Sequence, residues 1–306
     1  MGQSKGGTKR GQKQDKRAGQ KGRTKGDGSF VQKEQAGMRY ISSFTFSPKT
    51  IRNTNVYPYN VFNPKAGQTI PLDRVTMLYG DNGSGKSTIL NIIAYALGII
   101  GAEHPKTFGT RDFFAEYVSE CKTGRDFEDD DLRRVIPKAS RLIKSEDILY
   151  EIKKVQQEAV LMEGHVYDRM KFGMTREEAA AYKTGDEMGK QLERIAFAQE
   201  KYSNGETALH VFEDHIQAAG LFLLDEPEVS LSPGNQLRVA KMIEEAARFH
   251  AAQFVISTHS PFVLGSLDGT IFDLNCAEII PRAWYELENV RAYARFFLDR
   301  RNEFVI

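Results

Sequence analysis

The sequence predicts an α/β domain with a mainly parallel core sheet, antiparallel edge strands and a helical insertion. Short, wholly apolar runs at 221–224 and 253–256 are typical of strands that are buried on both faces of a parallel sheet. Helical sequence separates these runs, and strands that alternate with helices favour an α/β fold. A glycine-rich segment between a β-rich run and an apolar helix supports the same fold class.

The first elements lie between residues 40 and 97. Residues 40–46 alternate apolar and polar side chains, as a half-buried strand does. Residues 74–79 form a β-rich run that stops at Gly80, and residues 87–97 have the apolar character of a buried helix. The predicted order is therefore strand, glycine-rich loop, helix.

Residues 126–201 are highly charged and mostly helical in character, so we expect a helical insertion here. We interpret the five acidic residues within 126–131 as a solvated helix start, where negative charge suits the helix dipole, rather than as a cation site. Glycines are expected to interrupt the helical sequence, at Gly164, Gly173, Gly185 and Gly189. The core returns after Gly220, with a strand at 221–224, a helix at 237–250 and a strand at 253–256.

Charge is distributed unevenly along the 306 residues, although 42 Lys and Arg nearly balance 41 Asp and Glu. Residues 1–28 carry a charge of +7, which leaves −6 for residues 29–306. Residues 1–28 contain no Leu, Ile, Val, Phe, Tyr or Trp, so we expect disorder there. We therefore assign residues 1–37 to a basic tail and residues 38–306 to the folded domain. The tail is either an arm for nucleic acid or an anionic surface, or a solubilising segment.

Several protein classes are excluded by composition. The chain has two cysteines, Cys121 and Cys276, and no CxxC pattern, which argues against a disulfide framework or a cysteine zinc site. No apolar segment follows the basic start, so we expect no signal peptide. The longest mostly apolar stretch, 89–100, is shorter than the roughly 20 residues that a bilayer requires. We expect a soluble, cytoplasmic protein without membrane insertion.

The strongest motif is Gly80-Asp-Asn-Gly-Ser-Gly-Lys-Ser87, a full match to GxxxxGK[ST]. Its glycines let backbone N–H groups curl around a phosphate, and the following helix adds positive potential at its N-terminus. Lys86 reaches the β- and γ-phosphates, and the Ser87 hydroxyl binds Mg²⁺. We therefore predict an ATP site made of Gly80, Asp81, Asn82, Gly83, Ser84, Gly85, Lys86, Ser87 and Thr88.

A second motif follows the buried run at 221–224. Asp225 ends this predicted strand, and an aspartate in that position beside a phosphate loop holds Mg²⁺. The adjacent Glu226 is placed to act as general base on the attacking water. We expect Ser87 and Asp225 to bind the metal ion, and Glu226 to act in catalysis together with Lys86.

Two further segments indicate the class of nucleotide hydrolase: Tyr202-Ser-Asn-Gly-Glu206 and Ser257-Thr-His-Ser-Pro261. In this order and spacing, the motifs resemble those of the ABC-type ATPases. The resemblance implies that Ser203 and Gly205 cap the γ-phosphate bound by a second subunit, and that His259 contacts that phosphate catalytically. It also implies a homodimer on ATP binding, and it places residues 230–233 in the D-loop. Asn204 stands where this family more commonly has glycine.

The resemblance narrows further across residues 38–306. The segments at 57–60, 80–88, 221–233, 253–261 and 296–298 resemble a group of small predicted bacterial ATPases of the AAA/ABC type, which are related to RecF and SMC heads rather than to transporter subunits. No glutamine matches the Q-loop of ABC-type ATPases; Gln156 and Gln157 lie in helical sequence, and Glu116 is the available substitute. Candidates for stacking on adenine are Tyr57, Tyr59 and Phe62.

Three functions remain open. The first is an ATP hydrolase that works as an ATP-gated dimer switch in DNA repair or phage defence, with a nucleic-acid or effector partner. The second is the ATPase subunit of an ABC transporter, and the third is a regulatory ATP-dependent module with little turnover. The separation of 116 positions between Lys86 and Tyr202, with its charged helical sequence, favours the first. The presence of Glu226 and His259 argues against the third.

Overall fold

The computed structural model describes residues 39–105, 110–125, 136–181, 204–216 and 219–304. The chain divides into two units, Met1–Ala36 and Gly37–Ile306, and everything described below belongs to the second. The predicted tail and the acidic residues of 126–131 lie outside the described residues.

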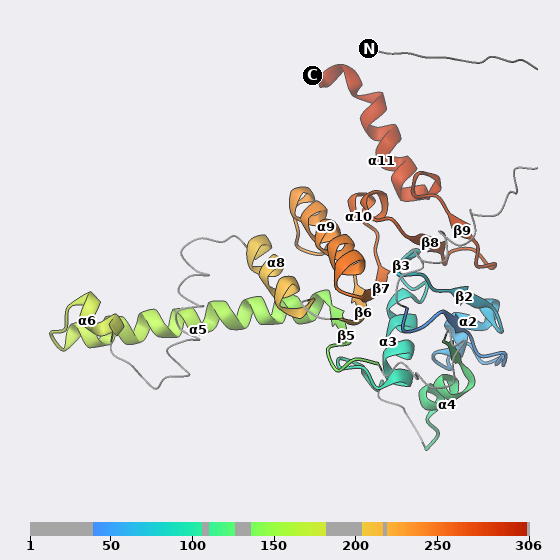
Figure 1. Cartoon of the computed structure of the whole chain (residues 1–306), viewed down its shortest axis with the longest axis horizontal. Helices are drawn as coiled ribbons and strands as arrows, with labels where there is room; N and C mark the ends of the chain where they lie inside the picture. The colour runs from blue at the N-terminus through green and yellow to red at the C-terminus, as the bar shows by residue number, and fades with distance from the viewer. Residues whose placement is uncertain (1–38, 106–109, 126–135, 182–203, 217–218, 305–306) are drawn as a thin grey trace, which may run out of the picture. The chain divides into compact units, whose positions relative to one another are not determined.

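A six-stranded sheet forms the centre of the fold (Figure 1). Its strands, in spatial order, are β5 (Arg141–Lys144), β6 (Gly220–Asp225), β7 (Ala252–Ser257), β3 (Val75–Tyr79), β8 (Thr270–Asp273) and β9 (Pro281–Arg282). The first five are parallel and β9 pairs antiparallel with β8, which confirms the predicted mainly parallel sheet with an antiparallel edge. β3 and β7 are buried throughout and β6 is buried up to Leu224, so both faces of these strands are apolar.

A separate antiparallel sheet has the order β2-β1-β4. It consists of β1 (Ser43–Thr45), β2 (Thr69–Pro71) and β4 (Lys122–Gly124). The strand predicted at 40–46 is therefore present but shorter, and it does not join the main sheet. Gln253 of β7 links this region to the main sheet, because its side-chain oxygen accepts hydrogen bonds from the backbone of Tyr40 and Ile41, at 2.7 and 3.1 Å.

Helices cover both faces of the main sheet, and side chains alternate between two cores. On one face, α3 (Lys86–Leu97) packs with Leu78 and Val255 and with the aromatic residues around β1. On the other face, α8 (Asn204–His215), α9 (Pro233–Phe249) and α10 (Pro261–Ser266) pack with Met77 and Ile256. This layering of helix, sheet and helix buries both faces of the central strands β3, β6 and β7 against apolar side chains.

The described part of the region predicted as a helical insertion contains one long helix, one short helix and a strand of the main sheet. α5 (Ser145–Lys171) follows β5 directly and packs against α6 (Arg176–Ala181) and α8. Gly164 does not interrupt α5, contrary to the prediction, whereas Gly173 follows the end of this helix with a φ of +93°. A single glycine inside a helix costs only about 1 kcal/mol relative to alanine, so flanking helix-forming residues outweigh it.

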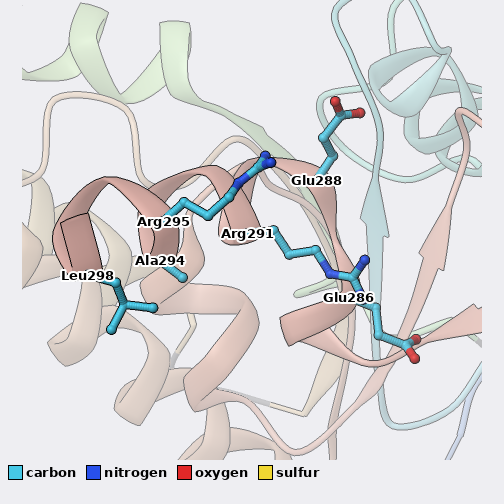
Figure 2. A pocket seen from close by; sticks show the side chains of 6 residues that line it. All are labelled: Glu286, Glu288, Arg291, Ala294, Arg295 and Leu298. Atoms are coloured by element: carbon cyan, nitrogen blue, oxygen red, sulfur yellow. The ribbon is translucent and has the colours of Figure 1, made fainter.

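The remaining helical elements are short, except for one near the C-terminus. They are α2 (Tyr59–Phe62), η1 (Asn63–Lys65), α4 (Phe113–Glu120), η2 (Trp284–Glu286), α11 (Glu288–Asp299) and η3 (Arg301–Glu303). A groove of about 550 Å³ runs along α11. Figure 2 shows the side chains that line it: Glu286, Glu288, Arg291, Ala294, Arg295 and Leu298. None of these residues belongs to the motifs at 80–88, 225–226 or 257–261. Among the helices described here, none is long and apolar enough to cross a bilayer.

Candidate functional site

Two glycines, Gly80 and Gly85, shape the loop between β3 and α3. Gly85 precedes α3 with a φ of +98°, in the region that favours glycine. A Cβ atom at Gly85 would lie 2.4 Å from the ring of Phe62. One at Gly80 would lie 2.6 Å from the Ser84 hydroxyl. The curled backbone therefore depends on both glycines.

Lys86 lies under this loop with its side chain turned back toward it. Its ammonium donates hydrogen bonds to the carbonyl oxygens of Gly80, at 2.7 Å, and Asp81, at 3.2 Å. Lys86 is only 4% exposed, and burial lowers its pKa, while Glu226, Asp225, Glu228 and Asp81 act in the opposite direction. A phosphate that entered the loop would meet the Lys86 ammonium, which is already held at the C-terminal edge of the sheet.

Asp225, at the end of β6, accepts hydrogen bonds from two hydroxyl groups. Ser87 Oγ donates a hydrogen bond to Asp225 Oδ1 at 2.9 Å, and Ser257 Oγ donates another to the same oxygen. Asp225 and Ser257 are register partners in the neighbouring strands β6 and β7. A hydroxyl and a carboxylate oxygen fit the donor set of Mg²⁺, which typically takes one or two carboxylates plus phosphate and water oxygens. Ser257 was not predicted as a site residue; its place after the buried run at 253–256 was the available signal.

Glu226 and His259 form a pair beside the phosphate loop. Glu226 has a φ of +50°, and its backbone N–H donates to Ser257 O at 3.0 Å, which fixes this unusual conformation. His259 Nε2 lies 3.6 Å from Glu226 Oε1, and the His259 ring meets the ring of Tyr79 edge-on at 6.1 Å. Lys86, Asp225, Glu226 and His259 thus gather at the C-terminal edge of β3, β6 and β7, where open α/β sheets bind ligands.

The surroundings of His259 favour the neutral form of its ring. Burial lowers the pKa of His259, and the nearby Lys86 ammonium lowers it further, although Glu226 and Asp81 act to raise it. Nε2 of His259 is buried and has no hydrogen-bond partner among the described residues. A buried polar atom without a partner is uncommon in proteins, so this nitrogen is available for a ligand.

Glu228 is a buried residue of this site that the sequence analysis did not select. Its Oε1 accepts hydrogen bonds from the backbone N–H groups of His259, at 2.7 Å, and Ser260, at 3.2 Å. Burial raises the pKa of Glu228 despite these bonds. Its position two residues after Glu226 was the only available hint.

Other predicted residues are not brought to this cluster by the described structure. Ser203 lies outside the described residues, and Gly205 lies in the first turn of α8. Their roles therefore stay predictions. Glu116, the suggested Q-loop substitute, forms a bidentate pair with Arg111, at 2.6 and 2.8 Å, on the exposed side of α4. Gln156 and Gln157 lie within α5.

Burial separates the three candidates for stacking on adenine. Tyr59 and Phe62 are fully buried, and the Tyr59 hydroxyl donates to Glu120 at 2.8 Å, so both belong to the core. Tyr57 is 38% exposed, and its hydroxyl donates to Thr88 Oγ1 of α3 at 3.2 Å. One face of the Tyr57 ring stacks on Phe114. Tyr57 therefore remains the candidate that borders the phosphate loop.

Two family models cover most of the folded unit. Residues 50–195, which include the phosphate loop, match the family described as "AAA domain". Residues 197–265, which include Asp225, Glu226 and His259, match the family described as "AAA domain, putative AbiEii toxin, Type IV TA system". The chain carries a P-loop ATPase domain of the AAA/ABC type.

This ATPase domain is also similar to a named fungal protein. The "ABC multidrug transporter atrC" of Emericella nidulans is 26% identical over 199 residues, which cover 58% of this chain and 13% of the fungal protein. The chain thus spans about an eighth of the length of the curated relative that it matches.

Solved structures resemble the domain more loosely. A nucleotide-free ATP-binding cassette from an ABC transporter is 16% identical with a TM-score of 0.43, covering 82% of this chain and 95% of the cassette. The SMC head domain from Thermotoga maritima is 14% identical with a TM-score of 0.37, covering 79% of this chain and 98% of that head.

Proposed function

We propose that this protein is an ATP hydrolase that works as an ATP-gated homodimer switch, acting on a nucleic-acid or effector partner in DNA repair or phage defence. The observation that supports hydrolysis most directly is the pairing of Glu226 with His259, at 3.6 Å, beside the Ser87–Asp225 hydrogen bond. A general base, a phosphate-facing imidazole and a metal-binding pair are the groups that ATP hydrolysis requires.

Each residue has a distinct role in the proposed reaction. The loop N–H groups hold the phosphates, and Lys86 exchanges its two carbonyl partners for phosphate oxygens. Ser87 and Asp225 would hold Mg²⁺, which when bound neutralises charge that develops on the phosphates. The Glu226 carboxylate accepts a proton from the attacking water, and His259 Nε2 donates a hydrogen bond to the γ-phosphate.

Measurement of ATP hydrolysis by the purified full chain tests this proposal. Glu226→Gln should keep ATP binding but lower turnover about 10²-fold or more, because general-base help is worth about that much. Lys86→Ala should weaken ATP binding itself. Glu245→Gln, at an exposed position of α9, is the matched control and should behave as the wild type does. Unchanged turnover in Glu226→Gln would show that another group activates the water.

The proposal also includes a cellular role, in phage defence or DNA repair. The family matched by residues 197–265 has a description that names a toxin, which supports a defence role. Expression of the wild type in bacterial cells should then inhibit growth, and Lys86→Ala should restore it. A wild type without effect on growth would instead favour DNA repair.

The proposal of a nucleic-acid partner is based on the composition of the basic tail. Lys and Arg on a glycine-rich chain offer phosphate contacts without a rigid element that could read sequence. The full chain should therefore bind nucleic acid more tightly than a chain that begins at Ser29, with a steeper dependence on salt. Equal affinities and equal salt slopes would identify the tail as a solubilising segment.

A further inference from the structure

The backbone of His259 is held from both sides by side chains of two different elements. Its N–H donates to Glu228 Oε1 at 2.7 Å, from the loop after β6. Its carbonyl oxygen accepts a hydrogen bond from Asn289 Nδ2 at 2.7 Å, from the first turn of α11. The backbone N–H and C=O groups of His259 are thus both held by side chains rather than by regular secondary structure.

Asn289 is itself held firmly in place. Its neighbours Leu287 and Val290 are 2% and 5% exposed and belong to the core that α8, α9 and α10 share with the sheet. The Asn289 backbone N–H also lies 3.4 Å from the hydroxyl of Tyr79, whose ring contacts His259. The start of α11 therefore presents the Asn289 amide to His259 from a buried, well-packed base.

We propose that Asn289 is a positioning residue that, together with Glu228, fixes His259 beside Glu226, so that the start of the C-terminal helix is part of the machinery for ATP hydrolysis. This inference rests on the proposed function. The physical reason is distance: His259 must place Nε2 at a phosphate oxygen, and a misplacement of about 1 Å can cost about 10²-fold in rate. Loss of the hydrogen bond from Asn289 frees the His259 carbonyl and with it the ring.

Asn289→Asp separates this role from a purely structural one. The variant keeps the shape of the side chain but replaces the amide donor with an oxygen, which repels the His259 carbonyl. In the first turn of a helix, a carboxylate also interacts favourably with the helix dipole. However, Asn289 Oδ1 is already buried without a partner among the described residues, so a carboxylate lowers stability whichever role Asn289 has; a residue that only stabilises α11 would still leave turnover normal in the folded variant.

The positioning role predicts the opposite pattern. In Asn289→Asp, measured under conditions in which the variant is folded, kcat for ATP should fall about tenfold or more, with KM for ATP close to that of the wild type. Asn302→Asp, the same substitution at an exposed position of η3, is the matched control and should retain wild-type kcat. A kcat for Asn289→Asp equal to that of Asn302→Asp would overturn the proposal.

A double-mutant cycle tests whether Asn289 acts through His259. In a His259→Ala background, Asn289→Asp should cause no further loss, because the group it positions is gone. If the two substitutions instead lowered kcat independently, so that the double variant showed the product of the two single losses, the proposal would be overturned. Hydrogen–deuterium exchange of residues 257–262 in the nucleotide-free full chain gives a readout apart from activity, and exchange should rise in Asn289→Asp but not in Asn302→Asp.

The failure of this inference differs from the failure of the proposed function. If the wild type hydrolyses ATP and His259→Ala loses turnover while Asn289→Asp does not, only the positioning role is wrong. If the wild type binds ATP without hydrolysing it, the proposed function is wrong, and the kinetic role of Asn289 is wrong with it.

Discussion

Ser87 and Asp225 lie 138 residues apart in the chain, yet Ser87 Oγ donates a hydrogen bond to Asp225 Oδ1 at 2.9 Å. The bond joins the first turn of α3 to the end of β6. It places a hydroxyl and a carboxylate oxygen side by side before any ligand arrives. The proposed metal site therefore needs little rearrangement of these two side chains.

Ser87→Ala should raise the Mg²⁺ concentration needed for half-maximal ATP hydrolysis by about tenfold or more, because even the loss of an outer partner of a metal ligand costs about 10–100-fold in affinity. Ser257→Ala removes the other donor to Asp225 and should have a smaller effect in the same direction. A Mg²⁺ titration of turnover measures both. An unchanged titration in Ser87→Ala would exclude Ser87 as a metal ligand.

Tyr57→Ala should weaken ATP binding about 5-fold to 100-fold, since stacking of a base on an aromatic ring is worth about 1–3 kcal/mol. Tyr57→Phe keeps the ring and loses only the hydroxyl that donates to Thr88, so its loss should be smaller. Equilibrium binding of ATP to both variants is the measurement. Equal losses in the two variants would assign the effect to the hydroxyl rather than to stacking.

The ATP-gated dimer yields a prediction for Ser203. In the proposed homodimer, by resemblance to ABC-type ATPases, Ser203 of each subunit would face the ATP of the other, and the nucleotide would become part of the interface. Glu226→Gln should form a long-lived dimer in saturating ATP and Mg²⁺, and addition of Ser203→Arg should break it. Light scattering with and without ATP is the test. A monomeric Glu226→Gln protein under these conditions would contradict the mechanism.

The lowered pKa of His259 predicts a pH dependence of stability in the nucleotide-free protein. In the unfolded chain the imidazole has its ordinary pKa of about 6.5, whereas burial and Lys86 hold it lower in the folded protein. As the pH falls below about 6.5, the unfolded chain takes up a proton that the folded chain resists, and the free energy of unfolding falls. His259→Gln should reduce this fall in urea unfolding between about pH 8 and pH 5.5.

Glu228 contributes with the opposite sign over part of this range. Burial raises its pKa, so the folded protein takes up a proton before the unfolded chain does, and the free energy of unfolding rises as the pH falls through that raised pKa. The comparison of His259→Gln with the wild type at each pH isolates the contribution of His259 to the free energy of unfolding. His250→Gln removes an imidazole at an exposed position and serves as the control. The same pH dependence in His259→Gln and His250→Gln would contradict the prediction.

Local sequence was sufficient for the phosphate loop and for the parallel centre of the sheet. Gly80 and Gly85 are required by the backbone conformation and close contacts of the loop itself, so their spacing identifies the loop without knowledge of the rest of the fold. Strands β6 and β7 are buried on both faces, and that burial appears directly in the chain as unbroken apolar runs.

β5 was missed because its sequence carries no comparable signal. It has four residues, with Arg141 and Lys144 at its ends and only Leu142 and Ile143 buried between them. An edge strand of this kind borders solvent, so its charged ends match the charged sequence that surrounds it. Its place beside β6 is decided by pairing across the sheet.

By itself, the sequence determined which chemical groups this protein can offer to ATP: the glycine loop, Lys86, Ser87, Asp225 and Glu226, together with the strands that carry them. Only the tertiary structure decided that Tyr57 rather than Tyr59 stays exposed beside Thr88, and that Glu228 and Asn289 meet the backbone of His259. The physical reason is that the motif is a property of consecutive residues, whereas burial and hydrogen bonding between distant elements depend on how those elements pack.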